Sequence, residues 1–206
     1  LALWRMHAIT LLKLACNFRN QILLTRSGQM PEIPLLDPLL EEVRANPESQ
    51  EALVQIYYYI YMGLAEPDKE GYYEGFKHIL FENPSAFGQE EARKLFQHAN
   101  NYCTRRYNSF KEHDDEEGMK RFQNELTELY ENQINHGIIF FHAKGTKMID
   151  PGDFKNIVVH FLKNNKSDTA KQFMDDYGEH LLKEWSKDAL NFCRGIWYFF
   201  EGEFGK

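Results

Sequence analysis

Apolar residues recur along most of this chain at intervals of three or four positions, which is the spacing of an amphipathic helix. Leu95, Phe96, Ala99 and Cys103 follow this spacing, and similar series lie on both sides of them. Alternating strand patterns are nearly absent, and Asn-Gly and Asp-Gly hairpin dipeptides do not occur. The pattern predicts about nine helices joined by short connections. We expect them at residues 1–26, 35–45, 48–65, 68–82, 88–111, 115–136, 151–165, 168–182 and 185–204.

Several helix starts carry capping signals. Asn46-Pro47 and Asp150-Pro151 each place a capping side chain directly before a proline, which is favoured in the first helical turn. Asp153 adds a carboxylate where the helix dipole favours negative charge. These residues predict that helices begin after positions 46 and 150.

The connection over residues 137–150 differs from the others because it is long and begins with an apolar run. We expect Ile138, Ile139, Phe140 and Phe141 to lie in the core, followed by a polar turn over residues 144–147. A short extended piece fits this segment.

The last part of the chain has an internal period. Phe161 and Tyr198 are both aromatic and lie 37 positions apart, and Gly195 precedes Tyr198 by three. Ala170 and Met174 follow Phe161 at nine and thirteen positions. This spacing resembles that of the tetratricopeptide repeat (TPR), in which two helices form each unit. The resemblance covers about residues 150–206.

Other positions agree with or depart from the TPR pattern. Phe76 and Pro84 keep the spacing of its final aromatic residue and proline. Asn191 and Arg194 replace its tryptophan and leucine, and Val158 replaces its glycine. The chain is therefore similar to divergent helical-repeat proteins of bacteria.

The resemblance implies an all-α fold in which antiparallel helix pairs stack as a right-handed α-solenoid, a TPR-like superhelix. We expect a single solenoid over 1–206, with N-terminal helix pairs in 1–83, a long helix pair and connection in 84–149, and TPR-like units in 150–206. The last unit would lack its second helix, so we expect the sequence to be a segment of a longer chain.

Composition and charge narrow the classes of function. Hydrophobic residues make up 43% of the chain, enough for a core, and the net charge of −7 disfavours nucleic-acid binding. Residues 1–31 carry four basic residues and no acid, so this helix either meets an anionic partner or packs beside the acidic segment that follows. Its broad apolar face favours packing. Three widely spaced cysteines and the lack of a long apolar run favour a reduced, cytoplasmic setting without membrane insertion.

Known catalytic and metal-binding motifs are missing from the sequence. No histidine follows a glutamate at three positions, and no H-E-x-x-H, phosphate-loop or G-x-S-x-G motif occurs. His113 stands beside four acidic residues, a cluster that is more typical of a solvated turn than of a metal site. We therefore expect no catalytic residue, no metal site and no cofactor.

A non-catalytic scaffold that binds a peptide or a partner helix in an apolar concave groove is the function that the sequence favours. The resemblance implies that the first helix of each pair lines this groove. The predicted contact residues are Lys155, Val159, Leu162, Phe192, Ile196 and Phe199, with a polar strip that includes Asn101 and Arg105. The alternatives are a helical-repeat RNA-binding protein and a non-catalytic part of a larger enzyme. An uncovered C-terminal helix would also promote self-association.

Overall fold

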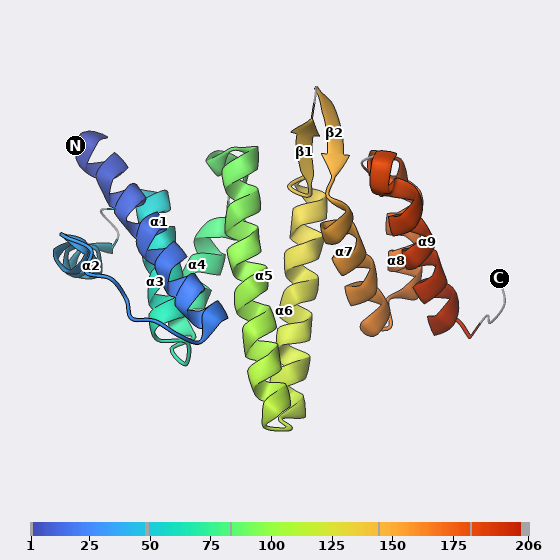
Figure 1. Ribbon diagram of the computed structural model, residues 1–206, viewed down its shortest axis with the longest axis horizontal. Coiled ribbons are helices and arrows are strands. Elements are labelled where there is room, and N and C mark those ends of the chain that lie inside the picture. The colour runs from blue at the N-terminus through green and yellow to red at the C-terminus, as the bar shows by residue number, and fades with distance from the viewer. Residues whose placement is uncertain (1, 48–49, 83, 144, 182, 203–206) are drawn as a thin grey trace. The chain divides into compact units, whose positions relative to one another are not determined.

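The computed structural model describes residues 2–47, 50–82, 84–143, 145–181 and 183–202. The chain divides into two compact units, Leu1–Phe87 and Gly88–Lys206. Within the described residues there are nine α-helices, with neighbours packed antiparallel, and one β-hairpin (Figure 1). The predicted helical character is confirmed, and the hairpin is the exception to the all-α expectation. Phe204 and the predicted helix end at 204 lie outside the described residues, as do the predicted starts at 1 and 48.

The first unit contains four helices. They are α1 (Ala2–Thr25), α2 (Leu36–Ala45), α3 (Ala52–Ala65) and α4 (Gly71–Glu82), followed by a 3₁₀ turn at Pro84–Phe87. The helix predicted over residues 48–65 corresponds to α3, whose α-helical residues begin at Ala52, while the predicted start at 48 lies outside the described residues. Asn46 ends α2, where its backbone N–H donates to the carbonyl oxygen of Glu42 at 3.1 Å. Pro47, which follows it, is in a 3₁₀ conformation.

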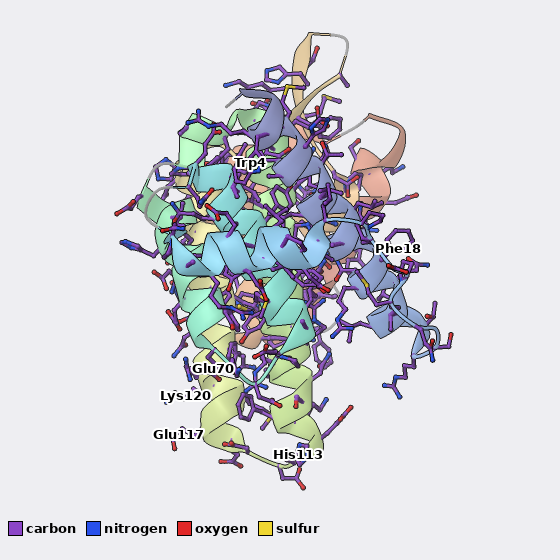
Figure 2. All side chains as sticks on the ribbon, turned by 90° about the vertical axis from the view of Figure 1, so that its left-hand side faces the viewer. Trp4, Phe18, Glu70, His113, Glu117 and Lys120 are labelled. Carbon is purple, nitrogen blue, oxygen red and sulfur yellow. The ribbon has the colours of Figure 1, made fainter. Side chains whose placement is uncertain are left out.

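A narrow apolar stripe holds α1 against α3. Ala8, Leu12, Ala15 and Cys16 are at most 2% exposed, and their i, i+4, i+7 spacing places them on one helix face. Because this stripe is narrow, apolar side chains on the rest of α1 remain exposed. Trp4 and Phe18, both labelled in Figure 2, are among them.

The second unit is built from two helix pairs, a hairpin and a final helix (Figure 1). Its elements are α5 (Gln89–Glu112), α6 (Glu116–Asn135), β1 (Phe140–Ala143), β2 (Thr146–Ile149), α7 (Pro151–Lys163), α8 (Ser167–Tyr177), a 3₁₀ turn at Gly178–His180, and α9 (Lys183–Phe200). The predicted boundaries agree with these within a few residues, except that α8 ends earlier, at Tyr177.

One apolar cluster, here called the core cluster, joins the hairpin to the last three helices. Phe154, Val158 and Phe161 on α7 are at most 1% exposed and lie at its centre. The cluster is completed by Ile139, Ile149, Ile157, Leu162, Ala170, Phe173, Met174, Leu181, Ala189 and Cys193. α7 contributes five of these residues and packs against both α8 and α9.

The cap predicted at the start of α7 is confirmed. The Asp150 carboxylate accepts hydrogen bonds from the backbone N–H groups of Gly152 at 2.8 Å and Asp153 at 3.2 Å. Pro151 occupies the first helical turn, where no intrahelical donor is needed.

The segment before α7 folds only partly as the sequence suggested. Ile138 and Ile139 are buried as expected, whereas Phe140 and Phe141 are only half-buried. The expected extended piece is an antiparallel hairpin between residues 140 and 149. Gly145 has a φ of 79°, a conformation that suits glycine in the turn.

The tip of the α5–α6 pair has no room for a side chain at Gly118. A Cβ atom there would lie 2.3 Å from the ring of Phe110, which stacks on Phe122 at 5.7 Å between centroids. Asp115 caps α6 by accepting from the Gly118 N–H at 2.9 Å. His113 and its acidic neighbours are exposed, so the predicted solvated turn is confirmed (Figure 2).

In the described part of the chain, no helix combines the length and apolar character that a bilayer crossing requires.

Candidate functional site

A groove of about 1160 Å³ lies in the second unit, between α5, α6, β1 and α7. Most of the side chains that line it are polar, and seven of them are the uncharged side chains of Asn, Gln or Thr. These are Gln89, Gln97, Asn100, Asn101, Thr104, Gln133 and Asn156. We call this hollow the polar groove.

Helical periodicity places the groove residues on single faces. On α5 the lining residues Gln89, Arg93, Gln97 and Asn100 recur at intervals of three or four, and so do Asp153, Asn156, His160 and Lys163 on α7. Other elements also contribute to the lining. Leu126, Tyr130 and Gln133 belong to α6, while Phe141 and His142 belong to β1.

Most charged groups in the polar groove have partners of opposite sign. Lys94 Nζ lies 2.7 Å from Glu90 Oε1, and Arg93 Nη2 lies 3.5 Å from Asp153 Oδ2. The Arg93 guanidinium also sits over the Phe141 ring at 5.3 Å. Lys163 is a groove cation for which the described residues provide no ion pair. The lining is therefore close to neutral.

His160 is held inside the groove in a neutral form. Its Nε2 lies 2.8 Å from Thr127 Oγ1, and its ring packs at 5.1 Å from that of Tyr130. Burial, and then the nearby Lys166 and Lys163 charges, lower the pKa of His160 to about 4. At neutral pH this side chain is an uncharged hydrogen-bonding group.

Asn100 presents an acceptor with no partner. Its Oδ1 is buried, and no hydrogen bond to it is formed by the described residues. A buried acceptor of this kind is unfavourable unless a donor reaches it. Asn100 is also one of the residues that line the polar groove.

Two of the contact residues predicted from the sequence meet in the polar groove. Asn101 on α5 and Val159 on α7 both line it. Arg105 lies one turn beyond Asn101 but is outside the lining, and burial lowers the pKa of its guanidinium. Leu162 is 1% exposed and belongs to the core cluster, so its side chain is covered in this structure.

The other predicted contact residues lie together on a different surface. The predicted residues Phe192 and Phe199 are exposed on α9, at 47% and 65%. Phe200, which was not predicted, is exposed beside them at 45%, and we call the surface of these three rings the α9 face. Ile196 is half-buried against the core cluster. The Lys155 ammonium lies over the Phe192 ring at 5.4 Å, which links α7 to this surface.

The sequence interpretation missed most of the groove. Gln97, Asn156 and His160 were not predicted as contact residues, although they line it. A search for polar residues repeating on one helix face would have found both stripes. Histidines were considered only as metal ligands, which left His160 without a role.

Neither metal ligation nor similarity to known proteins assigns a role to the groove. No group of three His, Cys, Asp or Glu residues in the described ranges could hold a metal ion. The chain matches no protein-family model, and no curated protein or solved structure is significantly similar to it. The functional argument therefore rests on the chemistry of the groove.

Proposed function

We propose that this chain is a non-catalytic scaffold that binds an extended segment of a partner protein in the polar groove. The observation that carries the proposal is the lining of uncharged amides and hydroxyls, which includes Asn100. A peptide unit offers one donor and one acceptor, and an Asn or Gln side chain offers both as well. The groove can therefore hold a peptide backbone without depending on a charged ligand.

The length of the groove fits a short peptide. Its lining on α5 runs from Gln89 to Thr104, which at the helical rise corresponds to about 22 Å. An extended chain advances about 3.3 Å per residue, so roughly six or seven residues fit. The predicted groove was apolar, whereas this one is mostly polar; we propose that the polar groove takes the partner.

The charge balance of the groove favours a peptide over RNA. Phosphate recognition uses several available cations, because each phosphate contact replaces bound counterions. Arg93 and Lys94 already pair with Asp153 and Glu90, and Lys163 is the remaining groove cation in the described residues. One cation of this kind is a weak basis for binding an RNA backbone.

We also propose how the helices of the second unit are arranged as repeats. We propose that α5–α6, α7–α8 and α9 are successive units of a TPR-like right-handed solenoid. Contacts of α7 with α6, α8 and α9 support this, since the first helix of a stacked unit touches its own partner and both neighbouring units. In that arrangement α5 and α7 are first helices, as the resemblance implies for residues that line a binding groove.

Selection from a random peptide library tests the proposed function. Twelve-residue peptides displayed on phage are selected against the 206-residue chain, and the dissociation constant of a selected synthetic peptide is measured by calorimetry. We expect Asn156→Leu to weaken binding about tenfold, because a bidentate amide contact is lost.

The matched control is Asn17→Leu, the same substitution at an exposed position of α1. It should leave the dissociation constant unchanged. Failure to select any peptide, or equal binding by the two variants, would show that the groove is not a peptide site.

A further inference from the structure

The hairpin has one covered edge and one open edge. β1 pairs with β2, and the far side of β2 is bridged to Leu181 through Ile149. The far side of β1 has no strand partner among the described residues. An open strand edge presents backbone N–H and C=O groups that can pair with another extended chain.

The register shows which backbone groups lie on the open edge. In an antiparallel ladder, residues alternate between bonding the partner strand and pointing away from it. The Phe140 carbonyl accepts from Gln89 Nε2 at 3.0 Å and the Phe140 N–H donates to the Gly137 carbonyl at 3.3 Å, so Phe140 points away from β2. Two residues later, His142 has the same orientation.

The backbone N–H and C=O groups of His142 therefore point to the open edge of β1. No hydrogen bond to its N–H or C=O is formed by the described residues outside the hairpin. His142 and Phe141 both line the polar groove, and so does Gln89, whose amide already bonds to this edge. The open edge of β1 is thus a boundary of the groove.

We propose that a peptide bound in the polar groove continues along β1 as a third strand. The His142 N–H would donate to a peptide carbonyl, and the His142 carbonyl would accept from a peptide N–H. This inference rests on the proposed function, because the same peptide occupies both places. Strand addition is a known mode of peptide recognition, in which backbone hydrogen bonds supply affinity.

Strand addition also constrains the ligand. A peptide on β1 must be extended, and its side chains must alternate between the two faces of the hairpin. β-branched and aromatic residues suit such a position, and a proline at the bonding residue does not. The partner is therefore a β-compatible segment rather than an amphipathic helix.

Two substitutions at one position test the proposal with the peptide selected from the library. His142→Pro removes the outward N–H, and because His142 faces Lys147 without bonding it, the bonds of the hairpin are kept. His142→Ala removes the same side chain and keeps the N–H. We expect the proline variant to bind about tenfold more weakly, and the alanine variant to bind within twofold of the unchanged protein.

Hydrogen exchange of the unchanged protein gives a second, independent readout. The His142 amide should exchange at least tenfold more slowly when the selected peptide is bound. This measurement decides the question even if His142→Pro disturbs the hairpin.

The outcomes separate the two proposals. Equal binding by His142→Pro and His142→Ala, with no slowing of exchange, would exclude strand addition, while sensitivity to Asn156→Leu would leave the groove proposal standing. If no peptide is selected, both the groove proposal and the strand-addition proposal are overturned.

Self-association gives a further outcome. If His142→Pro reduces self-association in sedimentation and leaves peptide affinity unchanged, the open edge of β1 pairs with a second copy of the chain, and the strand-addition proposal is wrong.

Discussion

The polar groove and the α9 face are two surfaces of one unit that share the core cluster but differ in chemistry. The groove is lined by amides and paired charges, whereas the α9 face exposes the rings of Phe192, Phe199 and Phe200. Water can form hydrogen bonds with the polar side chains of an empty groove. Covering an exposed ring, in contrast, is favourable by about 25 cal/mol of free energy per Å² of apolar surface removed from water. The groove should therefore select ligands by hydrogen-bond geometry, and the α9 face should associate with less discrimination.

The largest expected effect comes from removing the support common to both surfaces. Phe154 is fully buried in the core cluster, with its ring 5.1 Å from that of Phe173. We expect Phe154→Ala to lower the free energy of unfolding by about 3–5 kcal/mol, measured by urea denaturation. Phe200→Ala, at an exposed position, should change it by less than about 0.5 kcal/mol. If both variants lowered the free energy of unfolding by similar amounts, Phe154 would not belong to the core as described.

The next effect concerns the groove alone and depends on pH. The pKa of His160 is lowered to about 4 from an ordinary value of 6.5, so protonation is less favourable in the folded chain than in the unfolded chain. Stability from this group is complete above pH 6.5 and is lost as pH falls towards 4. The stability advantage of the unchanged protein over His160→Gln should therefore shrink by about 2–3 kcal/mol between pH 7 and pH 4.

Denaturation at several pH values checks this prediction. His98, whose pKa burial also lowers to about 4, is present in both proteins and its contribution cancels in the difference. A difference that stays constant with pH would show that His160 is not desolvated.

A smaller effect is expected at the α9 face. Phe199 is 65% exposed, and we predict that it contributes to self-association of the chain. Phe199→Asp should raise the dissociation constant for self-association at least tenfold, equivalent to about 1.4 kcal/mol, in sedimentation equilibrium. Asn191→Asp introduces the same charge at another exposed α9 position and should have little effect. A chain that stays monomeric at every concentration would refute the prediction.

The smallest effect tests the contact that links α7 to the α9 face. The Lys155 ammonium lies over the Phe192 ring, which is half exposed. A double-mutant cycle with Lys155→Met and Phe192→Leu should give a coupling of about 0.5–1 kcal/mol in the free energy of unfolding. Coupling near zero would mean that the two side chains do not interact in solution.

Helix positions were accessible from the sequence because they depend on local signals. The periodic apolar residues of α5 and α6 and the Asp150-Pro151 cap predicted helices that the structure confirms. Asn46-Pro47 gave a similar local signal, and Pro47 is in a 3₁₀ conformation. The α-helix α3 begins only at Ala52, after Glu51, which is extended.

The polar groove was less accessible because it depends on which helix faces meet. Asn101 and Val159 were predicted as contacts, but nothing in their local sequence shows that they line the same hollow. Their meeting follows from the packing of α6 against both α5 and α7. Leu162 was assigned to a binding face by analogy, while packing placed it in the core cluster.

The paired charges of the groove have a consequence for binding in salt. Added ions weaken interactions between exposed charges, with a screening length of about 8 Å at physiological ionic strength. Because Arg93 and Lys94 are already paired with acids of the same groove, a bound backbone would displace few counterions. Peptide affinity should then vary by less than about twofold between roughly 50 mM and 500 mM salt, so this recognition would be largely insensitive to ionic strength.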